Sequence, residues 1–141
     1  MLVENIEKYL PHRKPMLLLD SAELEEGVAR GKLQIKGDEW FVQGHFPDAP
    51  VVPGVILCEI LAQTTAFLIA DGVPENKTPY LVGLDDVRLK RPVAPGDLFE
   101  SECKIERIKA PFYFTDCKGY VGGKLCVKAR LSFALFDQMF N

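Results

Sequence analysis

Residues 55–70, VILCEILAQTTAFLIA, decide how the chain must fold. The segment reads as a helix, but its apolar residues lie on nearly every side instead of forming one stripe. A helix of this kind has to be covered all round, so it cannot rest on the outer surface of a sheet. It is also shorter than the about 20 apolar residues that a membrane span needs, and it includes Glu59 and Gln63. We therefore expect a buried central helix and no membrane anchor.

The segments around this helix predict a sheet that wraps it. In 99–106 and 124–133, apolar or small residues alternate with mostly charged ones, which is typical of strands with one dry and one wet face. Gly122-Gly123 predicts a two-residue hairpin turn after a strand over 112–121. Further elements are expected as strands over 16–24, 28–35 and 81–91 and as a short helix over 3–10. The chain, residues 1–141, is expected to be one α+β domain in which a curved antiparallel sheet encloses the helix.

Composition and charge exclude several classes of function. Lys and Arg number 17 against 20 Asp and Glu, a net charge of −3, so nothing favours generic binding to nucleic acid. The four cysteines form no Cys-x-x-Cys pair and lie at no ligand spacing from a histidine, so neither a metal site nor a redox motif is indicated. The N-terminus, MLVENIEKYL, is acidic and amphipathic, unlike a secretory signal. We expect a cytoplasmic protein with reduced thiols and no cofactor.

Glu59 is the first candidate for chemistry. A carboxylate inside an apolar helix is costly to bury as an anion, so it should be partnered, protonated or facing a cavity. One interpretation is a surface glutamate that is hydrogen-bonded to Gln63, four residues later. The alternative is a carboxylic acid whose apolar surroundings raise its pKa, which would make it a proton donor near neutral pH.

His45 and the start of the helix supply two further parts of a candidate site. Three prolines, at 47, 50 and 53, follow His45 in a constrained loop, which suits a positioned general base, although a lone histidine is more often structural. The other histidine, His12, is interpreted as structural. Pro53 at the first helical position, followed by Gly54 and Val55, predicts free backbone N–H groups that would bind a thioester or oxyanion. An ordinary proline-started helix is the alternative.

A base, an acid and an oxyanion hole together suit proton abstraction next to a carbonyl, with loss or migration of a group at the β carbon. Neither a nucleophile nor a phosphate loop is apparent in the sequence. From the residues alone, the prediction of function ends at this reaction class.

Four ordered segments extend the prediction by resemblance. These are LPHRKPMLLLD (10–20), DEWFVQGHFP (38–47), GHFPDAPVVPGVILCEILAQ (44–63) and YLVGLDDVRLKRPVAPGD (80–97). Together they resemble the Z-type 3-hydroxyacyl-[acyl-carrier-protein] dehydratases of fatty acid biosynthesis, which have the hotdog fold. The similarity covers about residues 6–135, nearly the whole chain.

The resemblance implies roles for individual residues. The family's catalytic histidine and glutamate map onto His45 and Glu59 at the same spacing, and Glu59 favours the Z-type over A-type enzymes, which carry Asp there. Dehydration would then use His45 as general base, Glu59 as general acid and the Gly54 N–H at the carbonyl oxygen. A backbone carbonyl near Val51 would fix the imidazole tautomer. Pro53 and Gln63 are taken as supporting residues.

The resemblance also implies partners. We expect a homodimer whose active sites combine histidine from one subunit with glutamate from the other, and further assembly into a trimer of dimers. The substrate would arrive on acyl carrier protein, which is acidic, so docking on a chain of net negative charge needs a local basic patch. The candidates for this patch are Arg88, Lys90, Arg91, Lys128 and Arg130. An ordinary solvated sheet face is the alternative explanation for these side chains.

Two other functions fit the same architecture. A thioesterase would release a free thiol from an acyl thioester, but nothing in the sequence specifically indicates it. A non-catalytic acyl-binding protein would need neither a buried acid nor a base, so the combination of His45, Pro53, Gly54 and Glu59 argues against it.

Overall fold

A computed structural model of the chain describes residues 2–3, 6, 10–43, 48–70, 73–74 and 77–137. Within these ranges lie one α-helix, α1 (Gly54–Ala70), and a single antiparallel sheet. Its strands are β1 (Leu2–Val3), β2 (Ser21–Glu25), β3 (Val28–Gln34), β4 (Lys77–Leu89), β5 (Leu98–Lys109), β6 (Phe112–Val121) and β7 (Lys124–Asp137).

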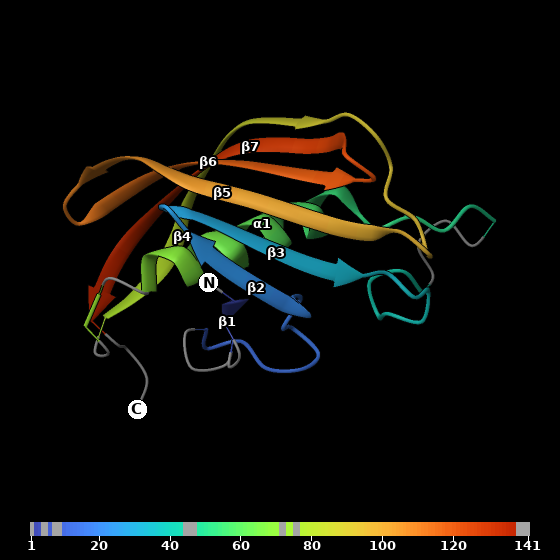
Figure 1. The fold of residues 1–141 in the computed structure, drawn as a ribbon, viewed down its shortest axis with the longest axis horizontal. Coiled ribbons are helices and arrows are strands. Elements are labelled where there is room, and N and C mark those ends of the chain that lie inside the picture. Colours follow the sequence, from blue (N-terminus) through green and yellow to red (C-terminus); the bar gives the residue numbers. More distant parts are fainter. Residues whose placement is uncertain are drawn as a thin grey trace.

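The sheet curves around the helix, as the apolar segment 55–70 requires (Figure 1). Its strand order is β1-β2-β3-β5-β6-β7-β4, and each neighbouring pair is antiparallel. Strands β3, β4, β5, β6 and β7 all contact α1. The α+β architecture expected from the sequence, a curved antiparallel sheet around one long helix, is therefore confirmed.

Polar side chains fix the helix against the sheet inside this core. Helix residues such as Ile60, Leu61 and Phe67 are completely buried. Thr64 Oγ1 lies 2.7 Å from Ser101 Oγ on β5, so the two buried hydroxyl groups share a hydrogen bond. Because buried polar groups specify one arrangement of their partners, this bond helps to set the position of α1 along the sheet.

The predicted alternation holds in both segments, with one exception. In β5 the odd positions of 99–103 are buried, while Lys104 and Glu106 are exposed. In β7 the alternation predicts a wet position for Cys126, but this residue is buried. The reason is that the chain after β4 folds against this strand, where the Cys126 carbonyl accepts hydrogen bonds from the N–H groups of Lys90 (2.7 Å) and Arg91 (3.2 Å). All four cysteines are buried free thiols.

The sequence misplaces two element boundaries. The strand expected from residue 16 begins only at Ser21, because the backbone at residues 16 and 18 bonds to the side chain of Gln63 instead of to a neighbouring strand. The helix expected over 3–10 is wrong at Val3, which pairs with Ala22 of β2. A short isolated helix is marginal in water, so pairing with an open sheet edge prevails there. Residues 4–5 and 7–9 lie outside the described part of the chain.

The predicted two-residue turn at Gly122-Gly123 forms with the backbone that such hairpins need, and the turn between β2 and β3 has the same backbone. Gly122 and Gly123 have φ of 57° and 79°, and Glu26 and Gly27 have φ of 50° and 79°. Positive φ at both central residues is the pattern of a type I′ turn, whose twist matches that of the flanking strands. Glu26 adopts this left-handed conformation although it has a Cβ, which makes the conformation energetically costly.

Candidate active site

The start of α1 presents two unused backbone donors. The Pro53 carbonyl accepts hydrogen bonds from the N–H groups of Ile56 (2.9 Å) and Leu57 (3.2 Å). We expected Pro53 to be the first helical residue, but Gly54 takes that position. Pro53 is the N-cap. Among the described residues, the N–H groups of Gly54 and Val55 donate no hydrogen bond. They lie at the positive end of the helix, which favours a negatively charged oxygen.

Leu89, the last residue of β4, lies over Gly54. A Cβ added to Gly54 would come within 2.5 Å of Leu89 Cδ1, so only glycine allows this approach. The two residues line a shallow pocket of about 190 Å³. Its other lining residues are Val52, Leu57, Lys90, Arg91 and Pro92. The free N–H groups of the helix thus lie beside a hollow that has an apolar floor and two cations at its rim.

Glu59 lies on α1 one turn after Val55, and its side chain is half-buried. Burial raises the pKa of the Glu59 carboxyl, and a hydrogen bond from Gln63 partly opposes this shift. The direction is the one that a proton donor near neutral pH requires. The surface glutamate of the first interpretation is therefore only half right: Gln63 lowers the pKa of the carboxyl, but Glu59 is half-buried and the amide of Gln63 bonds to Met16 and Leu18.

Gln63 is completely buried and ties α1 to the chain before β2. Its Oε1 accepts a hydrogen bond from the Leu18 N–H at 2.8 Å, and its Nε2 donates to the Met16 carbonyl at 2.7 Å. The side chain thus satisfies two backbone groups of a segment that joins no strand. These two bonds hold the middle of the helix that carries the Glu59 carboxyl group against that segment.

The structure describes only one of the two histidines, His12. His45 lies outside the described residues, while Val51, on the helix side of the same loop, is half-buried. His12 is half-buried, and its Nδ1 has no hydrogen-bond partner within the described ranges. Burial lowers the pKa of His12, and the neighbouring Arg13 lowers it further. His12 is therefore kept neutral.

The five basic residues proposed for carrier docking are all exposed, but they do not form one group. Lys90 and Arg91 follow β4 beside the pocket at Gly54. Arg88 and Lys128 lie directly opposite each other on β4 and β7. Arg130 makes an ion pair with Asp86, with 3.8 Å between Nη1 and Oδ2.

Sequence reasoning missed two residues that matter here. Leu89 gives no local signal, because its approach to Gly54 depends on how the end of β4 packs against the helix start. Lys118 on β6 lies opposite Lys128, a pairing that only the strand register reveals. The alternation of 112–121 would have placed Lys118 on the wet face, but not its neighbours.

In the described part of the chain, no helix has both the length and the apolar character needed to cross a membrane.

Comparison with known proteins identifies relatives that match over nearly the full length. Residues 10–130 match the family model of the FabA-like domain. The 3-hydroxyacyl-[acyl-carrier-protein] dehydratase FabZ of Natranaerobius thermophilus is 39% identical over 140 residues, which cover 96% of this chain and 98% of the relative. The protein of the same name from Staphylococcus aureus strain JH9 is 41% identical over 135 residues, covering 94% and 92%.

Solved structures agree on the architecture. A chain of the dehydratase heterocomplex ApeI:P from Xenorhabdus doucetiae superposes with a TM-score of 0.82 at 17% identity, covering 96% of this chain and 93% of its own. The Escherichia coli PaaI protein from the phenylacetic acid degradation operon gives a TM-score of 0.65 at 13% identity, covering 79% of each chain. At these identities the likeness concerns the fold alone, and that fold is the hotdog fold. By its sequence, the chain belongs to the FabA-like family and, within it, to the FabZ 3-hydroxyacyl-[acyl-carrier-protein] dehydratases.

Proposed function

We propose that the protein dehydrates (3R)-hydroxyacyl-[acyl-carrier-protein] to the trans-2-enoyl thioester in fatty acid biosynthesis. One observation carries the proposal beyond family membership. The helix that begins with two free N–H groups, at Gly54 and Val55, also carries a half-buried glutamate whose pKa is raised, one turn further along. These are the electrophilic and the acidic parts of a dehydratase site, and they are held on one rigid element.

The mechanism assigns each group one step. Neutral His45 removes the α proton, and the electron pair of that C–H bond moves toward the thioester oxygen, which the N–H groups of Gly54 and Val55 stabilise. As the α,β double bond forms, the bond from the β carbon to the hydroxyl oxygen breaks, and protonated Glu59 gives its proton so that water leaves. The Val51 carbonyl holds the proton on the other imidazole nitrogen. No metal or cofactor takes part in this scheme.

We place the complete site in a homodimer. Strand β4 is at the end of the sheet, and three of its apolar side chains point to the helix side yet remain exposed: Leu81 by 41%, Leu84 by 50% and Leu89 by 58%. Val55, at the helix start, is 77% exposed. A long apolar edge is an association surface. A second copy that pairs along β4 would cover these side chains and bring its His45 to Glu59, and such dimers would assemble in threes.

The substrate carrier and the location follow from the same proposal. Acyl carrier protein would deliver the 3-hydroxyacyl thioester in the cytoplasm. Its acidic surface would contact exposed cations among Arg88, Lys90, Arg91, Lys128 and Arg130, of which Lys90 and Arg91 lie beside the helix start. Charge contacts of this kind speed association and weaken as salt is added.

The test is an assay of the purified chain with 3-hydroxyacyl and trans-2-enoyl thioesters of several acyl lengths. We expect interconversion of the two thioesters, followed by absorbance of the conjugated enoyl group, with no release of free thiol. Thiol release without interconversion would contradict the proposal and would indicate a thioesterase. Binding of acyl carrier protein with neither reaction would indicate a protein that only binds acyl groups.

A further inference from the structure

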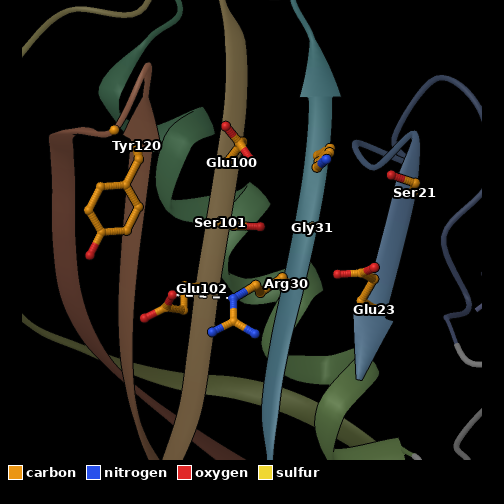
Figure 2. Close-up of a pocket in the computed structure, with 10 residues that line it drawn as sticks. Ser21, Glu23, Arg30, Gly31, Glu100, Ser101, Glu102 and Tyr120 are labelled. Carbon is orange, nitrogen blue, oxygen red and sulfur yellow. Dashed lines mark ion pairs between the residues drawn. The ribbon is translucent and has the colours of Figure 1, made fainter. Parts of the chain in front are cut away.

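The outer face of the sheet carries charges that alternate in sign from strand to strand. One row across it consists of Asp85, Arg130, Asp116 and Lys104, each directly opposite the next. Figure 2 shows a second place where this holds, with Arg30 between Glu23 and Glu102. Arg30 Nε lies 3.4 Å from Glu102 Oε2. Opposite charges on facing strands stabilise a sheet, so this alternation is what stability alone would favour.

The row that begins with Glu23, Arg30 and Glu102 departs from this rule at its other end. Arg88 on β4 faces Lys128 on β7, and Lys128 faces Lys118 on β6, so three cations stand side by side on adjacent strands. Within the described residues none of the three makes an ion pair. Lys118 lies opposite Glu102 on β5, but that carboxylate pairs with Arg30. Like charges directly opposite one another destabilise a sheet. The fold tolerates a local cost here that it avoids in the neighbouring rows.

The row lies in a groove that reaches β4, the strand whose last residue covers Gly54. The groove crosses the outer face of β4, β7 and β6, and its lining includes all three cations together with Arg130 and two acids, Asp86 and Asp116. Asp86 pairs with Arg130, which leaves the three-cation row as the uncompensated part. Arg88 immediately precedes Leu89, the residue that covers Gly54. The β4 end of the row is therefore one residue along the chain from the leucine beside the free N–H groups, with the two side chains on opposite faces of the sheet.

We propose that the row Arg88, Lys128 and Lys118 is the docking surface for an acidic protein, and that this protein is the acyl carrier protein of the proposed reaction, on which this inference rests. The whole chain has a net charge of −3, so general electrostatics would repel such a partner. Attraction must come from a local concentration of positive charge, and the row supplies it. Lys118 belongs to this docking surface and Arg130 does not, because Arg130 pairs with Asp86 and lies opposite Asp85 and Asp116 on the two adjacent strands.

Lys128→Glu tests the proposal with two opposite effects. The substitution restores alternation along the row, because an acid would stand between Arg88 and Lys118, so the melting temperature should rise. Binding of holo acyl carrier protein, measured by isothermal titration at low salt, should weaken about tenfold. The ratio of kcat/KM for the carrier-linked substrate to that for the same acyl group on N-acetylcysteamine should fall by a similar factor.

Lys109→Glu is the matched control. It makes the same change of charge at an exposed position of β5, seven residues beyond Glu102 and thus roughly 20 Å along the strand from the row. We expect no change in the melting temperature beyond about 2 °C and no change in carrier binding beyond about twofold.

The outcomes separate this inference from the proposed function. If both substrates are turned over and Lys128→Glu binds the carrier like the unaltered protein, the docking surface is wrong while the dehydratase stands. If neither substrate is turned over, the proposed function fails, and the titration still decides the docking surface. Equal weakening by Lys109→Glu, or tighter binding of duplex DNA than of carrier protein, would also overturn the inference.

Discussion

Leu89 Cδ1 occupies the space that a Cβ on residue 54 would need, at 2.5 Å from the position of that atom. Gly54 therefore leaves room for the Leu89 side chain, at the end of β4, to pack against the start of α1. The contact places an exposed leucine next to the two free N–H groups of the helix. A larger residue at position 54 would move Leu89 and so change the shape of the entrance to the candidate oxyanion hole.

Gly54→Ala should reduce activity more than stability. The Leu89 side chain is 58% exposed, so it can swing aside at a cost of about 1 kcal/mol or less in the free energy of unfolding. The added methyl group and the displaced leucine would crowd the N–H groups, and kcat/KM should fall about tenfold to a hundredfold. Adding Leu89→Ala to the same chain should restore part of this loss. Failure of the double variant to recover any activity would show that Leu89 is not the cause.

Gln63→Leu should destabilise the fold strongly. The change removes both hydrogen bonds to residues 16 and 18 and leaves a buried N–H and a carbonyl without partners. The free energy of unfolding should fall by about 2–4 kcal/mol in denaturant titration. Gln43→Leu is the control, because in the described part of the chain the Gln43 side chain bonds to the Asp38 carbonyl alone, at an exposed site. Equal effects of the two substitutions would contradict the role given to Gln63.

Glu59 should make stability depend on pH in a defined direction. Because burial raises the folded-state pKa of this carboxyl, the folded protein binds its proton more tightly than the unfolded chain does. The stabilisation is complete below the pKa of the unfolded state and is lost as pH rises through the folded-state pKa. Chemical denaturation between pH 4 and pH 8 should show this loss in the unaltered protein but not in Glu59→Gln.

Glu106→Gln controls for the removal of one negative charge at an exposed position of β5. If it flattens the pH dependence as much as Glu59→Gln does, the effect belongs to net charge and not to the buried carboxyl.

Glu26→Asn should stabilise the protein. Glu26 has a φ of 50° in the turn between β2 and β3, and this left-handed conformation is costly for a side chain that cannot bond locally to the backbone. Asparagine tolerates it better, so thermal unfolding should show a gain of about 0.5–1 kcal/mol. Glu25→Asn, one residue earlier in β2, should bring no gain, because asparagine is unfavourable in strands.

The features that the sequence predicts well are those that depend on local pattern. The all-round apolar character of 55–70 predicts a covered helix, and the alternation in 99–106 predicts which face of β5 is buried. The raised pKa of Glu59 likewise follows from apolar neighbours within one helix. Each inference needs only residues that are close in the chain.

The features that the sequence does not predict depend on pairing between distant segments. Cys126 is buried because the chain after β4 bonds to it, although its position in the alternating pattern predicts exposure. Pro53 caps the helix because of where its carbonyl points, which its residue type does not specify. Lys118 and Lys128 are ten residues apart, and only the register of β6 against β7 places them face to face.

The central claim is that His45 and Glu59 together dehydrate a 3-hydroxyacyl thioester in a site shared by two subunits. The most direct measurement compares His45→Ala and Glu59→Gln, each alone and after co-refolding at equal amounts, in the enoyl-forming assay. Each variant alone should be nearly inactive. The mixture should regain about a quarter of the unaltered activity, because half of the dimers would be mixed and each would hold one intact site of two. Full activity in either single variant, or no recovery in a mixture shown to contain mixed dimers, would contradict the account.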